Sequence, residues 1–188
     1  MIFKLKTAPA IEPIMVQDAK AHMRVETDED DLLISRLITM ARSRVEIITL
    51  RALITQTWEL YMDKFPSDEI ELSRAPIQSL TSIAYTKTDG TAGTVTSYQL
   101  DKSTEPARLS AAYGESWPAT KNILNAVLIT FVSGYGVKAE DVPEELKHAI
   151  KLIVAEFYER REHGIVAAQI SRVPLNAEWV LWPYRVFI

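Results

Sequence analysis

Side chains that bind metals or transfer protons are few and scattered in this sequence. It contains no cysteine, and its three histidines, His22, His148 and His163, fall in different segments or on different faces of an expected helix. No HExxH pattern occurs, so no pair of histidines shares one helical turn around a glutamate. A metal site needs clustered ligands, and thiolate or disulfide chemistry needs cysteine. We therefore expect no metal, and a protein suited to a reducing compartment or to a particle assembled there.

Nucleophile and phosphate-binding motifs are present only as fragments. Residues 114–118, GESWP, lack the second glycine of a GxSxG elbow, and residues 133–136, SGYG, lack the lysine and hydroxyl residue of a P-loop. A tight turn after a strand explains the latter glycines more simply. The carboxylates at 28–31 are explained by helix capping, and nothing selects those at 144–145 as an acid and base pair. We expect the protein not to be an enzyme and to hold no cofactor.

The basic residues cluster only at Arg36, Arg42, Arg44 and Arg51, and Glu46 partly offsets them. A solvated helix face with partners four residues apart is the favoured interpretation, and a surface facing DNA or another subunit is the alternative. The formal net charge is −4, which does not suit a protein that coats nucleic-acid phosphates.

Apolar spacing predicts the helices that would carry these side chains. A short helix is expected over 16–23, and a second over 28–49 with Thr27 or Asp28 as its cap. Apolar residues cover more than half of the second helix, so it should be buried on two sides. Either both sides belong to the core, which we favour, or one side meets another subunit.

The most regular helix is expected over 141–163, with Asp141 as N-cap, Pro143 in its first turn and Gly164 just beyond its end. Its apolar residues form one continuous stripe typical of a core-facing helix. A last short helix is expected over 174–182.

Between the second helix and this long helix the period changes from helical to alternating. Short strands are expected at 57–62, 70–72, 82–86, 98–101 and 107–109, with an Asp89-Gly90 turn and a buried central strand at 126–132. This predicts an α+β single domain in which residues 1–51 and 137–188 form a helical core. An antiparallel β-rich unit, 52–136, is inserted into that core.

Two C-terminal segments have an unusual composition. Residues 164–173 form an aliphatic arm with a single charge, and residues 182–188 pack three aromatic side chains, two aliphatic ones and an arginine. Such a tail either anchors an interface or folds into its own core, and we weigh the two equally. No apolar run is long enough to span a membrane, and the N-terminus lacks the apolar stretch of a signal peptide.

An ordered series of short motifs runs through nearly the whole chain. It comprises DAKAHMRV at 18–25, LSRAPI at 72–77, SYQLD at 97–101, PARL at 106–109, TFVSGYG at 130–136, VP at 142–143 with the helix at 144–162, and the PLxxExxLxxYR pattern at 174–185. The series resembles the head–tail connector, or adaptor, proteins of tailed phages. One departure is Val180-Leu181-Trp182, where the family tends to carry two leucines.

The resemblance implies a structural protein of a phage, prophage or gene-transfer particle. Such adaptors form rings beneath the portal, commonly of twelve copies, and dock a further connector or tail-completion protein. DNA passes through their channel without specific binding, so we expect a virion component assembled in the bacterial cytoplasm.

The resemblance also suggests where contacts should fall. We expect the tail after 182 to dock on the portal through Trp182, Tyr184, Arg185 and Phe187. We expect subunits to meet through the helix at 28–49 and the arm, at Leu33, Leu37, Met40, Ile48, Ile165, Val166 and Ile170. The alternative is a monomeric or dimeric binding module, such as an assembly chaperone or regulator.

Overall fold

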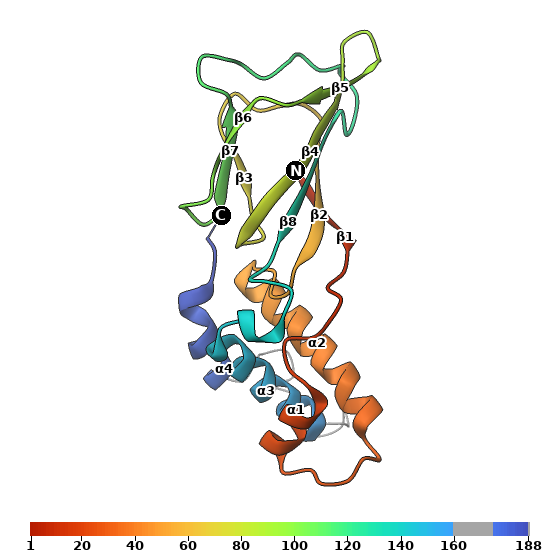
Figure 1. Ribbon diagram of the computed structural model, residues 1–188, viewed down its shortest axis with the longest axis vertical. Helices are drawn as coiled ribbons and strands as arrows, with labels where there is room; N and C mark the ends of the chain where they lie inside the picture. Colours follow the sequence, from red (N-terminus) through yellow and green to blue (C-terminus); the bar gives the residue numbers. More distant parts are fainter. Residues whose placement is uncertain (160–174, 188) are drawn as a thin grey trace, which may run out of the picture. The chain divides into compact units, whose positions relative to one another are not determined.

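The computed structural model describes residues 1–159 and 175–187 (Figure 1). The elements within these ranges are β1 (Ile2–Thr7), α1 (Val16–Met23), α2 (Asp31–Thr49), β2 (Gln56–Met62), β3 (Ile70–Leu72), β4 (Ile77–Thr86), β5 (Ala92–Val95), β6 (Tyr98–Asp101), β7 (Ala107–Ala111), β8 (Val127–Ser133), α3 (Glu144–Glu159) and α4 (Leu175–Leu181), with 3-10 turns η1 (Ala139–Asp141) and η2 (Trp182–Tyr184). All strand pairs are antiparallel, so the predicted α+β class is confirmed.

These elements group into two compact units. The sheet unit contains residues 1–10, 55–135, 186 and 187, and the helical unit contains residues 11–54, 136–159 and 175–185. Residues 1–10 belong to the sheet unit because β1 pairs with β2 along most of its length.

The sheet unit is built on a five-stranded sheet in the order β1-β2-β8-β4-β5 and a three-stranded sheet in the order β3-β7-β6. The predicted central strand is confirmed, because β8 pairs with β2 on one side and with β4 on the other. Apolar side chains from both sheets share one core, with Leu60, Phe131 and Ile129 from the larger sheet and Ile70 and Leu109 from the smaller. This shared core explains the alternating pattern of the strands.

The hairpin between β4 and β5 follows the predicted turn. Asp89 Oδ1 accepts hydrogen bonds from the backbone N–H and the hydroxyl of Thr91, and Gly90 adopts a φ of +92°. Strand β4 starts at Ile77, five residues before the predicted 82, and β5 was not predicted. Strand β5 lacks an alternating apolar pattern, since only Val95 among its residues is a large aliphatic side chain.

The helical unit is centred on α3, which packs against α1, α2 and α4. Its apolar stripe is buried from Leu146 to Val154, as expected for a core-facing helix, and is half-buried at Phe157 and Tyr158. The buried side of α2 consists of Ile34, Leu37, Ile38, Ala41 and Val45. In the described residues no helix is long and apolar enough to cross a membrane.

Both predicted helix caps are wrong. The Asp28 carboxylate accepts a hydrogen bond from Lys20 Nζ at 2.5 Å, and α2 begins only after Asp30. Asp141 closes the preceding 3-10 turn, where its Oδ2 accepts from the Lys138 N–H at 3.0 Å. Each carboxylate thus accepts from another donor, Lys20 Nζ or the Lys138 N–H, in place of the helix terminus that the sequence pattern assigned to it. The 3-10 turn ends with Val142 as its C-cap, and helix α3 begins two residues later, at Glu144.

The predicted solvated arginine face of α2 is also only half right. Arg36 and Arg44 are exposed, whereas Arg42 and Arg51 are buried. Arg42 Nη1 donates to Glu46 Oε2 at 2.8 Å, and its Nε donates to Glu12 Oε2 at 2.7 Å. Arg42 lies on a different side of α2 from Arg36 and Arg44, and Arg51 follows the end of the helix, where its Nε donates to the Tyr184 carbonyl.

Candidate assembly surfaces

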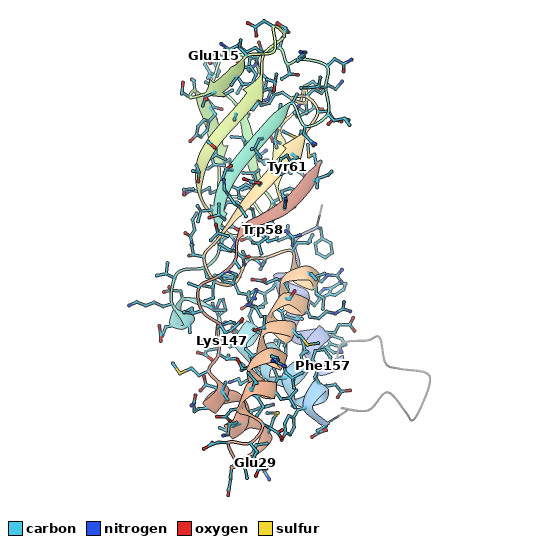
Figure 2. All side chains as sticks on the ribbon, turned by 90° about the vertical axis from the view of Figure 1, so that its right-hand side faces the viewer. Glu29, Trp58, Tyr61, Glu115, Lys147 and Phe157 are labelled. Atoms are coloured by element: carbon cyan, nitrogen blue, oxygen red, sulfur yellow. The ribbon has the colours of Figure 1, made fainter. Side chains whose placement is uncertain are left out.

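Helix α2 carries three large apolar side chains on its outward side. Leu32, Met40 and Ile47 are 67%, 55% and 57% exposed. At about 3.6 residues per turn these positions fall on one face of the helix, opposite the buried stripe. Figure 2 shows side chains standing along the outward side of α2. We call Leu32, Met40 and Ile47, with the intervening Arg36 and adjoining Arg44, the α2 face.

Charge surrounds this apolar surface. Arg36 and Arg44 are exposed, and neither forms an ion pair with another residue of the described ranges. The apolar side chains and the two guanidinium groups thus form a mixed surface of aliphatic and positively charged character. Aliphatic groups beside arginine are typical of protein interfaces more than of solvated helix faces.

The predicted interface residues of this helix are placed differently from one another. Met40 lies on the α2 face, Leu33 and Ile48 are half-buried, and Leu37 lies in the core. Leu37 points toward the packed side of α2 and is not available to another subunit. The predicted residues Ile165, Val166 and Ile170 of the arm lie outside the described residues.

Leu32 and Ile47, the other two apolar residues of the α2 face, were not among the predicted interface residues. The signal was present, because the apolar residues of this helix cover more than one stripe. Which stripe faces the core is decided by α1 and α3, and their packing direction is not encoded in the periodicity of α2 itself.

The residues expected at the C-terminal tail divide into held and exposed side chains. Tyr184 is held by its own chain, because its backbone carbonyl accepts from Arg51 Nε at 2.6 Å and its hydroxyl donates to Glu145 Oε2 at 3.0 Å. Burial and the hydrogen bond to Glu145 raise the pKa of the Tyr184 phenol. Tyr184 is therefore an internal anchor at the end of the helical unit.

The other three predicted tail residues are exposed. The Arg185 guanidinium lies 5.2 Å from the centre of the Trp182 ring, and Phe187 is 66% exposed although its neighbour Val186 is buried. The tail therefore combines a fixed backbone with outward aromatic rings. The packing of Tyr184 and Val186 on their own chain fits the interpretation that the tail folds back on its own core, and the interface anchor stays a prediction.

Helix α4 offers a further aromatic side chain that sequence reasoning did not single out. Trp179 is 78% exposed, and Glu178 beside it is exposed as well. The other side of α4 is fixed in the helical unit through Ala177 and Leu181, which are fully buried. A rigidly mounted, solvent-facing tryptophan is a strong candidate for a contact with another protein.

The sheet unit has a cleft of about 970 Å³ near the turn between β2 and β3. The stacked rings of Phe65 and Trp117, 4.8 Å apart, line it together with Asp68, Glu69 and Glu115. No group of three potential metal ligands occurs within the described part of the chain.

Comparison with known proteins identifies relatives of this arrangement. A sequence profile of the family described as "Phage gp6-like head-tail connector protein" matches residues 13–110. No curated protein is similar enough in sequence to be matched to the chain.

Solved structures extend the similarity to the whole chain. One from the "Neck of empty GTA particle computed with C6 symmetry" has a TM-score of 0.82 at 22% identity, covering 100% of this chain and 97% of that one. The "Virion of native gene transfer agent (GTA) particle" matches with a TM-score of 0.81 at the same identity and coverage. The "Neck of native GTA particle computed with C12 symmetry" matches with a TM-score of 0.75, 22% identity and the same coverage.

Proposed function

The chain belongs to the phage gp6-like head-tail connector family, and from this premise we propose that it is a structural protein that forms a ring at a head–tail junction. The ring extends the DNA channel below the portal and docks the next connector or tail component. The observation that carries the proposal is the family match, which covers more than half of the chain.

The similar solved structures support a ring as the assembly. They come from particle necks with C6 and C12 symmetry, and they match this fold over its full length. We propose twelve copies, because twelve satisfies both symmetries. A closed ring needs two different surfaces on each subunit, and the α2 face and α4 supply two surfaces with different chemistry.

The tail is proposed as the contact with the portal. Phe187 and Trp182 present exposed aromatic rings next to the buried Val186 and the anchored Tyr184. An aromatic ring on a fixed backbone loses little conformational freedom on binding, which favours affinity. Tyr184 holds the tail in place, and Trp182, Arg185 and Phe187 make the contacts.

DNA is proposed to pass through the ring without being bound. The net charge of −4 per chain multiplies around a ring, so the assembly as a whole repels a phosphate backbone. Such a conduit releases DNA more readily than a basic one. Assembly takes place in the bacterial cytoplasm, and the mature location is the virion.

Native mass spectrometry and negative-stain microscopy test the ring. The purified protein is measured alone over a range of concentrations and then with its cognate portal. Rings of about twelve chains, alone or on the portal, are the expected result. A chain that stays monomeric in both conditions overturns the proposal and favours an assembly chaperone or regulator.

Truncation tests the portal contact separately. Removal of residues 186–188 together with Trp182→Ala should abolish portal binding, while far-UV circular dichroism stays that of the folded protein. Glu178→Gln, an exposed change in the nearby α4, serves as the matched control. Undiminished portal binding by the truncated chain contradicts the role of the tail.

A further inference from the structure

We infer that neighbouring subunits join by seating Trp179 and Glu178 of one copy on the α2 face of the next copy. The inference rests on the proposed ring and assigns its contacts. It commits to a second copy of this chain as the occupant of the α2 face, and the case is made from chemistry, geometry and symmetry.

The two surfaces are complementary in chemistry. The α2 face has a centre of Leu32, Met40 and Ile47 with Arg36 and Arg44 beside it, and α4 presents an indole next to a carboxylate. An indole gains from burial against aliphatic groups and from a guanidinium stacked on its ring. The Glu178 carboxylate can then accept hydrogen bonds from the same arginines.

Both surfaces carry charged groups that can still form ion pairs. Arg36, Arg44 and Glu178 have no ionic partner among residues 1–159 and 175–187. By contrast, the buried Arg42 already has two carboxylate partners, Glu12 and Glu46. The helix thus separates arginines that complete the fold from arginines available to another chain.

The two surfaces are also mounted on rigid supports. Helix α2 is fixed through its buried stripe and through the Arg42 network, and α4 is fixed through Ala177 and Leu181. A contact between such surfaces does not require a segment to become ordered first. The angle between consecutive subunits is then set by the helical unit itself, as a closed ring requires.

A contact within one chain is disfavoured by the directions of the two surfaces. Helix α4 packs against α3 and also contacts α2, but Trp179 lies on the exposed side of α4, away from Ala177 and Leu181. The α2 face lies opposite the buried stripe of α2. Both surfaces are therefore directed to solvent and open to another copy.

A two-fold pairing of two α2 faces is disfavoured by charge. Such a pairing would bring Arg36 and Arg44 of one copy against the same two arginines of the other. Contact between the α2 face and α4 instead unites opposite charges, and it leaves each subunit with one free surface of each kind. Because each bound subunit still presents one free surface of each kind, further subunits can add one at a time until the ring closes.

Charge insertion tests the α2 face. Met40→Asp places a carboxylate in the apolar centre, and Ser35→Asp places the same charge on an exposed position of the same helix outside the face. Native mass spectrometry over a dilution series should show ring formation shifted to at least about 100-fold higher concentration for Met40→Asp, a tenfold change being about 1.4 kcal/mol. Ser35→Asp should assemble like the wild type.

Disulfide trapping tests the pairing directly. The chain contains no cysteine, so Met40→Cys and Trp179→Cys introduce the only thiols. Under mild oxidation the double variant should give a ladder of covalent oligomers up to the full ring, and each single variant should give at most dimers. A mixture of the two single variants should give a heterodimer.

The outcomes separate this inference from the proposed function. Rings formed by the wild type and equally well by Met40→Asp, with no ladder from the double variant, overturn the inference and leave the connector ring standing. Crosslinking of Met40→Cys alone into dimers as efficiently as the mixture indicates a two-fold contact and also overturns it. A wild type that never assembles, alone or on the portal, refutes both.

Discussion

Removing the Glu46 carboxylate should destabilise the helical unit more than any surface change on α2. Glu46 is 7% exposed and accepts hydrogen bonds from Arg42 Nη1 at 2.8 Å and from the backbone N–H of Leu53 at 3.0 Å. Arg42, 9% exposed, also donates to Glu12. One carboxylate therefore joins the middle of α2 to the segment that follows it.

The size of the effect follows from what Glu46→Ala leaves behind. Loss of one partner from a buried ion pair costs about 3–5 kcal/mol, and the low end applies because Glu12 still faces the guanidinium. The Leu53 N–H, in a fully buried residue, loses its acceptor at a further cost of about 1–3 kcal/mol. With about 3 kcal/mol for the ion pair and about 2 kcal/mol for the N–H, we expect Glu46→Ala to lower the free energy of unfolding by about 5 kcal/mol in total. Glu46→Gln should cost about 2 kcal/mol less than that, since its amide oxygen can still accept from Leu53.

Urea unfolding followed by circular dichroism at 222 nm measures both variants, since that signal is dominated by the helical unit. Ser43→Ala, an exposed change on the same helix, is the control and should lie within about 0.5 kcal/mol of the wild type. If Glu46→Ala does not fold at all, Glu46→Gln still reports the ionic part. A loss below about 1 kcal/mol for Glu46→Ala would refute the account of a buried carboxylate that is hydrogen-bonded to Arg42 and to the Leu53 N–H.

Two further predictions concern acid stability. The pKa of His22 is lowered by burial and by the charges of the neighbouring His148 and Lys151. The unfolded chain therefore takes up this proton at a higher pH than the folded chain, and stability falls as the pH drops below about 6.5. The His22 and His148 rings pack edge to face with their centres 5.8 Å apart. His148→Gln should raise the His22 pKa measured by NMR and weaken this pH dependence, and an unchanged His22 titration would contradict an effect of His148 on His22. Hydrogen bonds from Ser103 and Arg108 lower the pKa of Asp101 to about 2, so its contribution is present above the ordinary value of 3.8 and is lost as the pH falls toward 2. Asp101→Asn should flatten the acid limb of the stability curve in that range, and a limb identical to the wild type would rule out this carboxylate as its source.

The sequence predicted most elements because each depends on a local periodicity. The alternation in β2 and the single stripe of α3 both follow from one buried side per element, which a linear pattern can record. The central position of β8 could also be predicted from the sequence, since a strand that is apolar on both faces must be covered on both faces.

What the sequence did not predict depends on which of several possible partners a side chain meets in the folded chain. Asp28 and Asp141 carry the right side chain for a cap, yet Lys20 and the Lys138 backbone N–H compete for them successfully. Likewise Arg42 and Arg44 look equivalent in the sequence. Only the packing of Glu12 and Glu46 beside one of them makes it a buried group. Such choices between donors are decided by tertiary geometry and leave no periodic signal.

The central place of β8 has a consequence for synthesis on the ribosome. Its partners β2 and β4 are made well before it, and neither can be joined to the other until residues 127–133 have left the exit tunnel. Until then the nascent chain displays two open strand edges, which are the features most prone to unwanted pairing with other chains. Helices α1 and α2 likewise cannot bury their apolar sides against α3 until α3 has been synthesised. The protein therefore completes both of its cores nearly together, late in translation, and a pause in the codons just after residue 133 should matter more for its yield than one earlier in the gene.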